Sequence, residues 1–259
     1  MPLAWTIVSL ALAATVWAAP APAGAGSADV PYVGCETDVM GGVHHLAAPT
    51  GAPRAIDAPP VIGLQLAFYQ AQRSAGVLMP GIYAPRHWHC YAYQGAGIAE
   101  LVVAPRPLSA ADVGGDDHPD PGISLLDFPS DTGPGFNFAS QIIASYFPQR
   151  LNDFLQRWGA TSSGKGTSGA MPGATAHIWP ADSVQSLDER TVLVTTPLGS
   201  RGFGTSGGWF SPGPLPVHSL IVLDRDTYGV HELRVRLPPV DASLLPVIER
   251  AEHRELAGR

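Results

Sequence analysis

HELRVRL, residues 231–237, alternates polar and apolar side chains from Glu232 onward. Because successive side chains of a β-strand point to opposite faces, this pattern predicts a strand with one face buried. Two β-branched runs upstream, TVLVTT at residues 191–196 and SLIVL at 219–223, predict two more strands. We expect these strands to form a sheet in the C-terminal third of the chain, with a closing helix over residues 243–256.

A helical pattern lies before these strands, on both sides of Pro148. Pro148 is expected to kink or restart the helix, because proline lacks the N–H of the helical hydrogen bond. Residues 61–74 follow Pro59-Pro60 and predict a shorter helix that Gly76 ends. The apolar residues of the longer pattern recur at intervals of three and four, the spacing of one helix face: Ile142, Ile143, Tyr146, Phe147, Leu151, Phe154, Leu155 and Trp158.

The N-terminal half combines one hairpin with irregular stretches. Residues 83–93 are rich in aromatic side chains, Gly95 and Gly97 follow, and residues 98–103 are rich in β-branched ones. This order predicts two strands joined by a turn. Irregular or flexible segments are expected where proline, glycine and small or acidic residues dominate: residues 29–60, 104–135 and 159–175.

Composition limits the possible architectures. Glycine supplies 29 and proline 26 of the 259 residues, which excludes a coiled coil, a helical repeat and a long-helix bundle. No glycine recurs at every third residue, so collagen is excluded as well. Runs of strands with grouped helices favour the α+β class. We therefore expect a single loop-rich α+β domain over residues 29–259, with a mostly antiparallel sheet and two or three helices.

The charge balance argues against a nucleic-acid partner. The chain carries 15 Lys and Arg against 22 Asp and Glu, and Lys165 is its single lysine. A nucleic-acid-binding surface needs clustered basic residues, and the sequence contains no such cluster. We also expect no cofactor. The stretch from Gly159 to Lys165 departs from a phosphate-binding loop, because Gly166 stands where Ser or Thr is needed.

The first residues predict an export signal over residues 1–18. An apolar run spans residues 4–18, and small residues follow it, with cleavage expected there or as late as residue 25. The run is shorter than a membrane span, and no later segment approaches about eighteen apolar residues. The alternative is a buried N-terminal helix, against which Pro20 and Pro22 argue. We expect an exported protein, periplasmic or extracellular, that is not embedded in a membrane.

Cys35 and Cys90 are the two cysteines of the chain. In an oxidising compartment an even pair is most simply one disulfide. One alternative is lipidation of Cys35, which Tyr32 fits poorly because a small aliphatic residue is wanted at that position. The other alternative is a pair of free thiols.

The sequence GTSGG at residues 204–208 is a candidate nucleophile motif. It matches the Gly-x-Ser-x-Gly pattern of a nucleophile elbow, but the prolines that follow do not start the helix which that elbow needs. It also resembles the serine motif of chymotrypsin-like proteases, in which backbone N–H groups face an oxyanion. That alternative predicts a serine hydrolase with Ser206 as nucleophile, His89 as base and Asp127 as the third residue. Thr205 replaces the usual acidic residue, and a glycine-rich turn is the simpler interpretation.

His87 and His89 are a candidate metal-binding pair. On a strand their imidazoles would share one face, about 7 Å apart along the chain. That arrangement suits Cu(II) or Zn(II), with His44 and His45 as further ligands. The simpler interpretation is an aromatic core in which the ring nitrogens have hydrogen-bond partners. The aspartates between residues 112 and 131 suit calcium chemically, but they lack a recognised ligand spacing and predict a solvated acidic loop.

Three stretches stand out together: GVL at 76–78 with APRHWHC at 84–90, TPLG at 196–199 with GFGT at 202–205, and VRLP at 235–238. Their combination resembles a group of bacterial exported proteins of unassigned function, mostly from high-GC genomes. The resemblance implies a secreted or periplasmic protein with one disulfide, and it transfers no catalytic residue. It also makes Ser206 incidental to a Thr-Pro…Gly-x-Gly-Thr loop.

The function expected from these features is the binding of a ligand or of an envelope protein, without catalysis. Residues 83–93 are the candidate site, because exposed Trp and Tyr side chains supply much of the energy of recognition. Within this segment Arg86, His87 and Trp88 are the candidate binding residues. The alternative role for Arg86 is to cap a turn.

Overall fold

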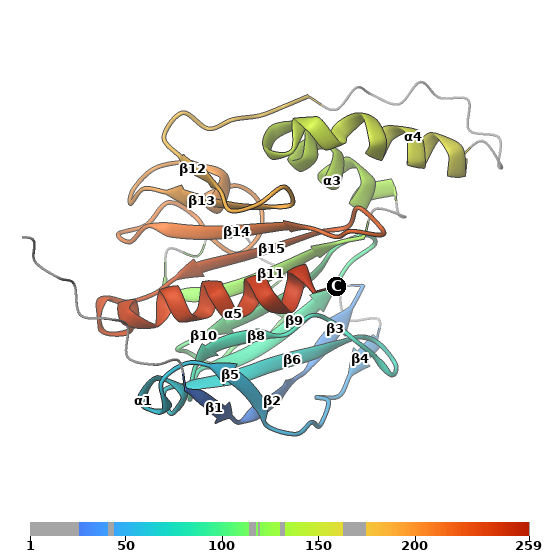
Figure 1. The fold of residues 1–259 in the computed structure, drawn as a ribbon. Coiled ribbons are helices and arrows are strands. Elements are labelled where there is room, and N and C mark those ends of the chain that lie inside the picture. The colour runs from blue at the N-terminus through green and yellow to red at the C-terminus, as the bar shows by residue number, and fades with distance from the viewer. Residues whose placement is uncertain are drawn as a thin grey trace, which may run out of the picture.

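One long sheet organises the chain (Figure 1). The computed structural model describes residues 26–40, 44–113, 118, 120–129, 133–162 and 175–258. Neighbouring strands of the sheet are antiparallel except β3 and β9, which run parallel. Counted over the described residues, the sheet has nine strands in this order: β12 (Ser183–Ser186), β13 (Thr191–Thr196), β14 (Val217–Leu223), β15 (Val230–Arg236), β11 (Gly122–Phe128), β10 (Ala99–Ala104), β9 (His89–Gln94), β3 (Thr37–Val39) and β4 (His44–Leu46).

Smaller sheets pack beside the long one. β6 (Leu66–Ser74) pairs in parallel with β2 (Tyr32–Cys35) and antiparallel with β7 (Val77–Leu78) and β8 (Ile82–Pro85). β1 (Ser27–Val30) and β5 (Arg54–Asp57) form a two-stranded ribbon. The α+β expectation therefore holds at the level of class, but the sheets are mixed rather than purely antiparallel.

The helices lie on opposite faces of the long sheet. In Figure 1 α3 (Gly133–Tyr146) and α4 (Leu151–Ser162) lie together at the top, and α5 (Leu245–Ala257) crosses the centre of the view. Two short helices, α1 (Pro60–Gly63) and α2 (Ala110–Val113), complete the helices of the described segments. A 3₁₀ turn at Pro148–Arg150 separates α3 from α4, which confirms the interruption predicted at Pro148.

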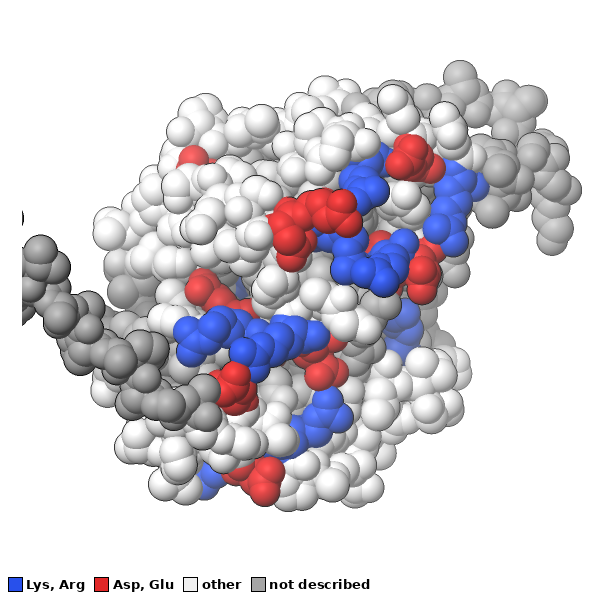
Figure 2. Space-filling view, viewed as in Figure 1, with Lys and Arg blue, Asp and Glu red and all other residues white. Residues whose placement is uncertain are grey.

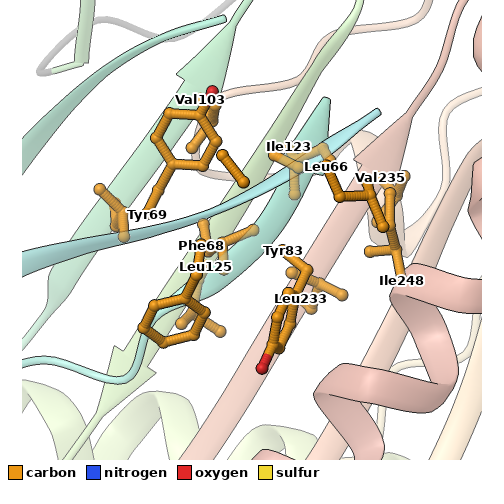
Figure 3. Close-up of a cluster of buried hydrophobic side chains, with 14 of the residues drawn as sticks. Leu66, Phe68, Tyr69, Tyr83, Val103, Ile123, Leu125, Leu233, Val235 and Ile248 are labelled. Carbon is orange, nitrogen blue, oxygen red and sulfur yellow. The ribbon is translucent and has the colours of Figure 1, made fainter. Parts of the chain in front are cut away.

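Side-chain alternation along the central strands divides the interior into two layers. Leu125 and Leu233 point to one face, where they pack with β6, β8 and α5 (Figure 3). Leu126 and Val230 belong to the layer on the opposite face, beneath α3 and α4. All seven residues of β15 are buried, so the polar positions of HELRVRL do not face solvent as the half-buried pattern predicted. The strand is covered on both faces, with Glu232 and Arg234 on the face beneath α3 and His231 on the opposite face.

The strands predicted in the C-terminal third are confirmed. β13 spans residues 191–196 as expected, and β14 and β15 match the other two runs to within two residues at each end. The closing helix is α5, and the predicted hairpin is the β9–β10 pair, with Gly97 in the turn.

The helix predicted over residues 61–74 is wrong. The helix α1 ends at Gly63, and β6 follows from Leu66. The residues from Leu66 to Ala71 are all buried, because β6 lies between β2 and β8 and also packs on the long sheet. A short run buried on both faces has no period that separates a strand from a helix, so sequence pattern alone misassigned it.

Two segments expected to be irregular contain strands. Residues 29–60 hold pieces of five short strands, each too short to show a period. Within residues 104–135 the strand β11 lies at the centre of the sheet, and all seven of its residues are buried. The proline- and aspartate-rich flanks of β11 hid this apolar run. The predicted export signal at residues 1–18, and most of the predicted loop at 159–175, lie outside the described residues.

Cys35 and Cys90 form a disulfide, which confirms the pairing predicted from the sequence. Cys35 ends β2 and Cys90 lies on β9, so the bond ties a small sheet to the long one. Lipidation of Cys35 and two free thiols are thereby set aside.

The surface that carries α5 mixes charges of both signs. Figure 2 shows basic and acidic side chains side by side on this face, without an extended patch of one sign. Ion pairs account for part of this pattern, including Arg54 with Glu255 at 3.0 Å and Arg254 with Asp57 at 2.6 Å. Within the described residues, no helix has both the length and the apolar character needed to cross a membrane.

Removal of the disulfide should destabilise the fold without changing its architecture. The bond spans 55 residues of chain, and closing a loop of that length restricts the unfolded state by about 4 kcal/mol. Urea unfolding of the oxidised protein should therefore give a free energy of unfolding higher by that amount than unfolding in reductant. A Cys35→Ser, Cys90→Ser double variant should be insensitive to reductant, and equal stability of all forms would contradict the prediction.

Candidate functional site

Three neighbouring strands place polar side chains on the sheet face that α3 covers. Glu100 on β10 and Glu232 on β15 both pair with Leu126 of β11, one from each side. Two residues along the same strands, Ser124 of β11 pairs with Arg234 of β15. These positions share one face because residues two apart on a strand point the same way. The result is a buried cluster of charged and polar side chains at the centre of the sheet.

Arg234 links this group to a loop. Its Nε donates to Glu232 Oε1, and the two side chains are 4% and 1% exposed. Its Nη1 donates to the carbonyl oxygen of Gly207, and its Nη2 donates to the carbonyl oxygen of Ser206 at 3.3 Å. One guanidinium therefore neutralises a buried carboxylate and holds the backbone of the glycine-rich loop over the sheet.

Glu100 is a second buried carboxyl group beside this pair. Its Oε1 accepts hydrogen bonds from Ser124 Oγ at 2.9 Å and from the Trp209 backbone N–H at 3.3 Å. Burial raises the pKa of Glu100 to about 7, although Ser124, Arg234 and the Trp209 amide favour its charged form. Burial also raises the pKa of Glu232, against the opposing effect of Arg234. Desolvation explains both shifts, because a carboxylate loses its hydration inside the protein.

A hydrogen-bonded brace fixes the loop that carries Ser206. Thr196 Oγ1 donates to Asp182 Oδ1 at 2.8 Å and accepts from the Gly204 N–H at 3.0 Å. Asp182 Oδ2 accepts from the Phe203 N–H at 2.7 Å. The TPLG and GFGT stretches are thus one structural unit, which sets the position of residues 206–208.

A cavity of about 290 Å³ opens between this loop, α3 and the sheet. Glu232 and Arg234 form part of its buried floor, and Ser206 and His177 lie at its exposed mouth. The His177 N–H donates to Ser145 Oγ of α3 at 2.8 Å, which ties the mouth to the helix. Its walls are mainly apolar and aromatic, and include Leu126, Phe128, Phe138, Ile142, Trp179 and Phe203.

Tyr146 at the end of α3 lies beside the cavity wall. Its ring meets the ring of Phe203 edge-on, with 5.0 Å between centroids. Its hydroxyl is buried and has no hydrogen-bond partner among the described residues. Burial, together with the charges of Asp182 and Glu232, raises the pKa of Tyr146 above its ordinary value.

The structure does not bring Ser206, His89 and Asp127 together. Asp127 faces the opposite side of the sheet from Glu232, where it contacts Arg73 and the ring of His231. His89 begins β9, whereas Tyr93 of that strand is the residue that pairs with Glu100. At about 3.4 Å per residue, the four-residue interval between those two positions of β9 spans about 14 Å. Of the three, Ser206 alone lines the cavity described here.

Arg86, His87 and Trp88 form the turn between β8 and β9. The Trp88 N–H donates to the Pro85 carbonyl at 3.4 Å, and His87 has φ 75°, the left-handed value that a type II turn requires at this position. Arg86 Nε donates to the Leu66 carbonyl at 3.4 Å, and Trp88 packs half-buried against the core. His87 is the exposed residue of the three.

The histidine candidates do not assemble a metal site in the described part of the chain. No group of three or more His, Cys, Asp and Glu side chains there is arranged to hold a metal ion. His45 contacts Asp38 at 3.1 Å and Glu36 at 3.7 Å on the surface. Several aspartates of the predicted acidic loop, among them Asp116 and Asp117, lie outside the described residues.

The sequence did not predict the buried charged residues of the site, which are Glu232 and Arg234 on the floor and Glu100 beside it. One signal was present, because Glu232 and Arg234 alternate within an apolar strand of a chain that is only 14% charged. That alternation was interpreted as a solvent-facing side. A pattern within the strand could not show that α3 packs over Glu232 and Arg234.

Comparisons with models of known protein families and with curated proteins find no match for this chain. The assignment of a function therefore depends on the geometry of the site.

Substitution of Gly208 should disturb the site more than substitution of its neighbour. Gly207 and Gly208 have φ 67° and 84°, so alanine is strained at either position by about 1–2 kcal/mol. A Cβ on Gly207 would meet nothing within 4 Å, whereas one on Gly208 would lie 3.2 Å from Arg234 Nη1 and 3.5 Å from Glu100 Oε1. Gly208→Ala should therefore lower the urea midpoint more than Gly207→Ala, and equal midpoints would contradict contact with the charged floor.

The pH dependence of stability should report the buried Glu100. Below its ordinary value of 4.5 the carboxyl is protonated in both states, and between 4.5 and about 7 the folded protein keeps a proton that the unfolded chain loses. The free energy of unfolding should therefore fall as the pH rises from 4.5 to about 7, by at most about 1.4 kcal/mol per pH unit for this group. Above pH 7 the contribution of this group should level off. Urea titrations should show a flatter profile for Glu100→Gln.

Glu189→Gln is the control for this titration, because the Glu189 side chain is 72% exposed. Its pH profile should match that of the unmodified protein. A Glu100→Gln profile as steep as that of the unmodified protein would show that Glu100 is ionised across the range.

Proposed function

We propose that this protein binds a small, largely apolar molecule in the cavity between α3 and the long sheet. The observation that carries the proposal is an apolar and aromatic cavity with a buried ion pair, Glu232 and Arg234, on its floor. Small-molecule sites typically combine apolar walls with a few convergent polar groups. The volume of about 290 Å³ lies near the lower end of the range of about 300–1,000 Å³ that is typical of small-molecule sites.

The ion pair supports a binding role because stability does not explain it. A buried carboxylate and guanidinium contribute little more than apolar residues of the same size, and each costs desolvation free energy. The loop carbonyls of Ser206 and Gly207 also accept from Arg234, so the guanidinium positions the cavity mouth as well. Charged groups held at the base of an apolar cavity can orient a ligand.

The disulfide supports a location outside the cytoplasm. Disulfides persist in oxidising compartments, and the Cys35–Cys90 bond is compatible with an exported protein. The export signal predicted over residues 1–18 would place the protein in the periplasm or the medium. Ligand binding there, without catalysis, is the function that we retain.

The proposal moves the binding site away from the turn at Arg86, His87 and Trp88, where Arg86 and Trp88 hold the turn to the core. Binding at that turn remains a prediction. The serine-hydrolase alternative has Ser206 at the cavity mouth, but no described contact joins it to His89 or Asp127. The Cu/Zn alternative at His87 and His89 likewise has no supporting geometry.

Filling the cavity should abolish binding of a small aromatic probe. Ile98 lines the cavity and is half-buried, so Ile98→Trp should occupy its space. We expect 2-phenylethanol to bind the unmodified protein in saturation-transfer NMR and titration calorimetry, and to bind Ile98→Trp at least about tenfold more weakly.

Ile178→Trp is the matched control, because Ile178 is 63% exposed and does not line the cavity. It should bind the probe as the unmodified protein does. The proposal fails if the unmodified protein binds none of a panel of small aromatic probes, or if Ile98→Trp binds them undiminished.

A further inference from the structure

The cavity floor and the side chains directly beside it hold more acidic than basic groups. Glu232 lines the cavity and is 1% exposed, and Glu100 lies beside the floor and is 6% exposed. Among the described residues, Arg234 is the single cation that contacts either carboxyl group. Arg234 Nε donates its hydrogen bond to Glu232, whereas Glu100 accepts hydrogen bonds from the neutral donors Ser124 and Trp209. Buried carboxylates need a compensating positive charge or a proton. Two carboxyl groups therefore share one guanidinium.

The other charged or titratable groups around the cavity do not supply this missing charge. From α3, the Tyr146 hydroxyl is neutral and lies in the field of Asp182, Glu232 and Arg234. Asp182 adds a further negative charge beside the wall, in its brace with Thr196 and Phe203. His177 lies exposed at the mouth, with its ring against Trp179. The interior of the site is thus electronegative.

Aromatic walls complement this charge. Trp179, Phe203, Phe128 and Phe138 line the cavity, and aromatic faces attract cations through their quadrupoles. Arg234 itself uses this chemistry, because its guanidinium lies 5.5 Å from the centre of the Phe203 ring. A carboxylate floor under aromatic walls suits a positively charged group better than a neutral or negative one.

We propose that the ligand is a protonated amine with a small apolar body, whose ammonium group donates to the Glu232 carboxylate at the cavity floor. This inference rests on the proposed function, and it names the chemical class of the ligand. Glu232 lines the cavity and accepts one hydrogen bond from Arg234, so an acceptor oxygen of the same carboxylate remains for an ammonium donor. The apolar body would lie among Phe128, Phe138 and Ile142.

A proton on Glu100 is the other way to compensate this charge. With a pKa of about 7, Glu100 is protonated in a fraction of the molecules at neutral pH. An ammonium group at Glu232 would add a positive charge to the floor and so favour the ionised form of Glu100. Amine binding should therefore release a proton, and the affinity for amines should fall as the pH is lowered from 7 to 5.

Three probes of one shape separate the possible ligand classes. Titration calorimetry at pH 7 would compare 2-phenylethylamine, 2-phenylethanol and 3-phenylpropanoate, which carry a positive, a neutral and a negative group. We expect the amine to bind about tenfold or more tightly than the alcohol, the gain typical of a charge-assisted hydrogen bond. We expect the anion to bind most weakly.

Two variants test whether the preference for an amine over an alcohol comes from Glu232 and Glu100. Glu232→Gln keeps the volume of the side chain and should bring amine and alcohol to similar affinities. Because that variant leaves Arg234 without its carboxylate, Glu100→Gln provides a second test that preserves the ion pair. It should reduce both the amine preference and the proton release. Glu249→Gln is the matched control, since burial raises the pKa of Glu249 to about 7 but the residue lies on α5, across the sheet from the cavity.

The pH titration needs one further control at the mouth. An imidazole can gain a proton between pH 5 and 8, so His177→Gln should be compared with the unmodified protein. We expect the loss of amine affinity below pH 7 to persist in His177→Gln and to be smaller in Glu100→Gln, where Glu232 is the remaining buried carboxyl group of the pair. The alcohol should bind with the same affinity across this range.

The outcomes distinguish this inference from the proposed function. Equal binding of amine and alcohol, or tightest binding of the anion, would overturn the inference and leave a ligand-binding cavity. An amine preference unchanged in both Glu232→Gln and Glu100→Gln would overturn it as well. Binding of none of the three probes would overturn the proposed function itself.

Discussion

The contact of Arg234 with Glu232 and with the loop carbonyls is the interaction on which the site depends. The guanidinium is planar and carries five donors, so it can serve a carboxylate and two backbone oxygens from one buried position. It lies on β15, next to the central strand of the sheet, where the backbone is held on both sides. The loop is thereby held against the middle of the long sheet.

The same loop is held from its other end by the brace of Thr196 and Asp182. These residues precede it in the sequence, and they bind the N–H groups of Gly204 and Phe203 rather than the carbonyls that Arg234 binds. The N–H groups of the loop are therefore bound by Thr196 and Asp182, and its carbonyl groups by Arg234. A loop fixed in this way can form one rim of a cavity, with α3 forming the other.

Sequence pattern predicted the elements whose signals are local. Pro148 interrupts a helix wherever that helix packs, and TVLVTT reads as a strand because its side chains are β-branched. β6 and β11 escaped prediction because both are buried on two faces, which erases the alternation that marks a strand. For the site, the glycine-rich stretch drew attention to Ser206, which does line the cavity. Glu100 lies far away in the sequence from Glu232 and Arg234, and no spacing relates them.

The sequence by itself determined which strands close the chain and where the long helix breaks, and it made a Cys35–Cys90 disulfide the simplest pairing. Each of these depends on short-range periodicity, on proline chemistry or on having two cysteines. The tertiary structure alone decided that HELRVRL is covered on both faces, because α3 packs over its polar side. The alternation in the sequence predicted that Glu232 and Arg234 face solvent. In the structure they form a buried ion pair on the cavity floor. A charge acquires that character from what surrounds it, and those surroundings come from distant segments of the chain.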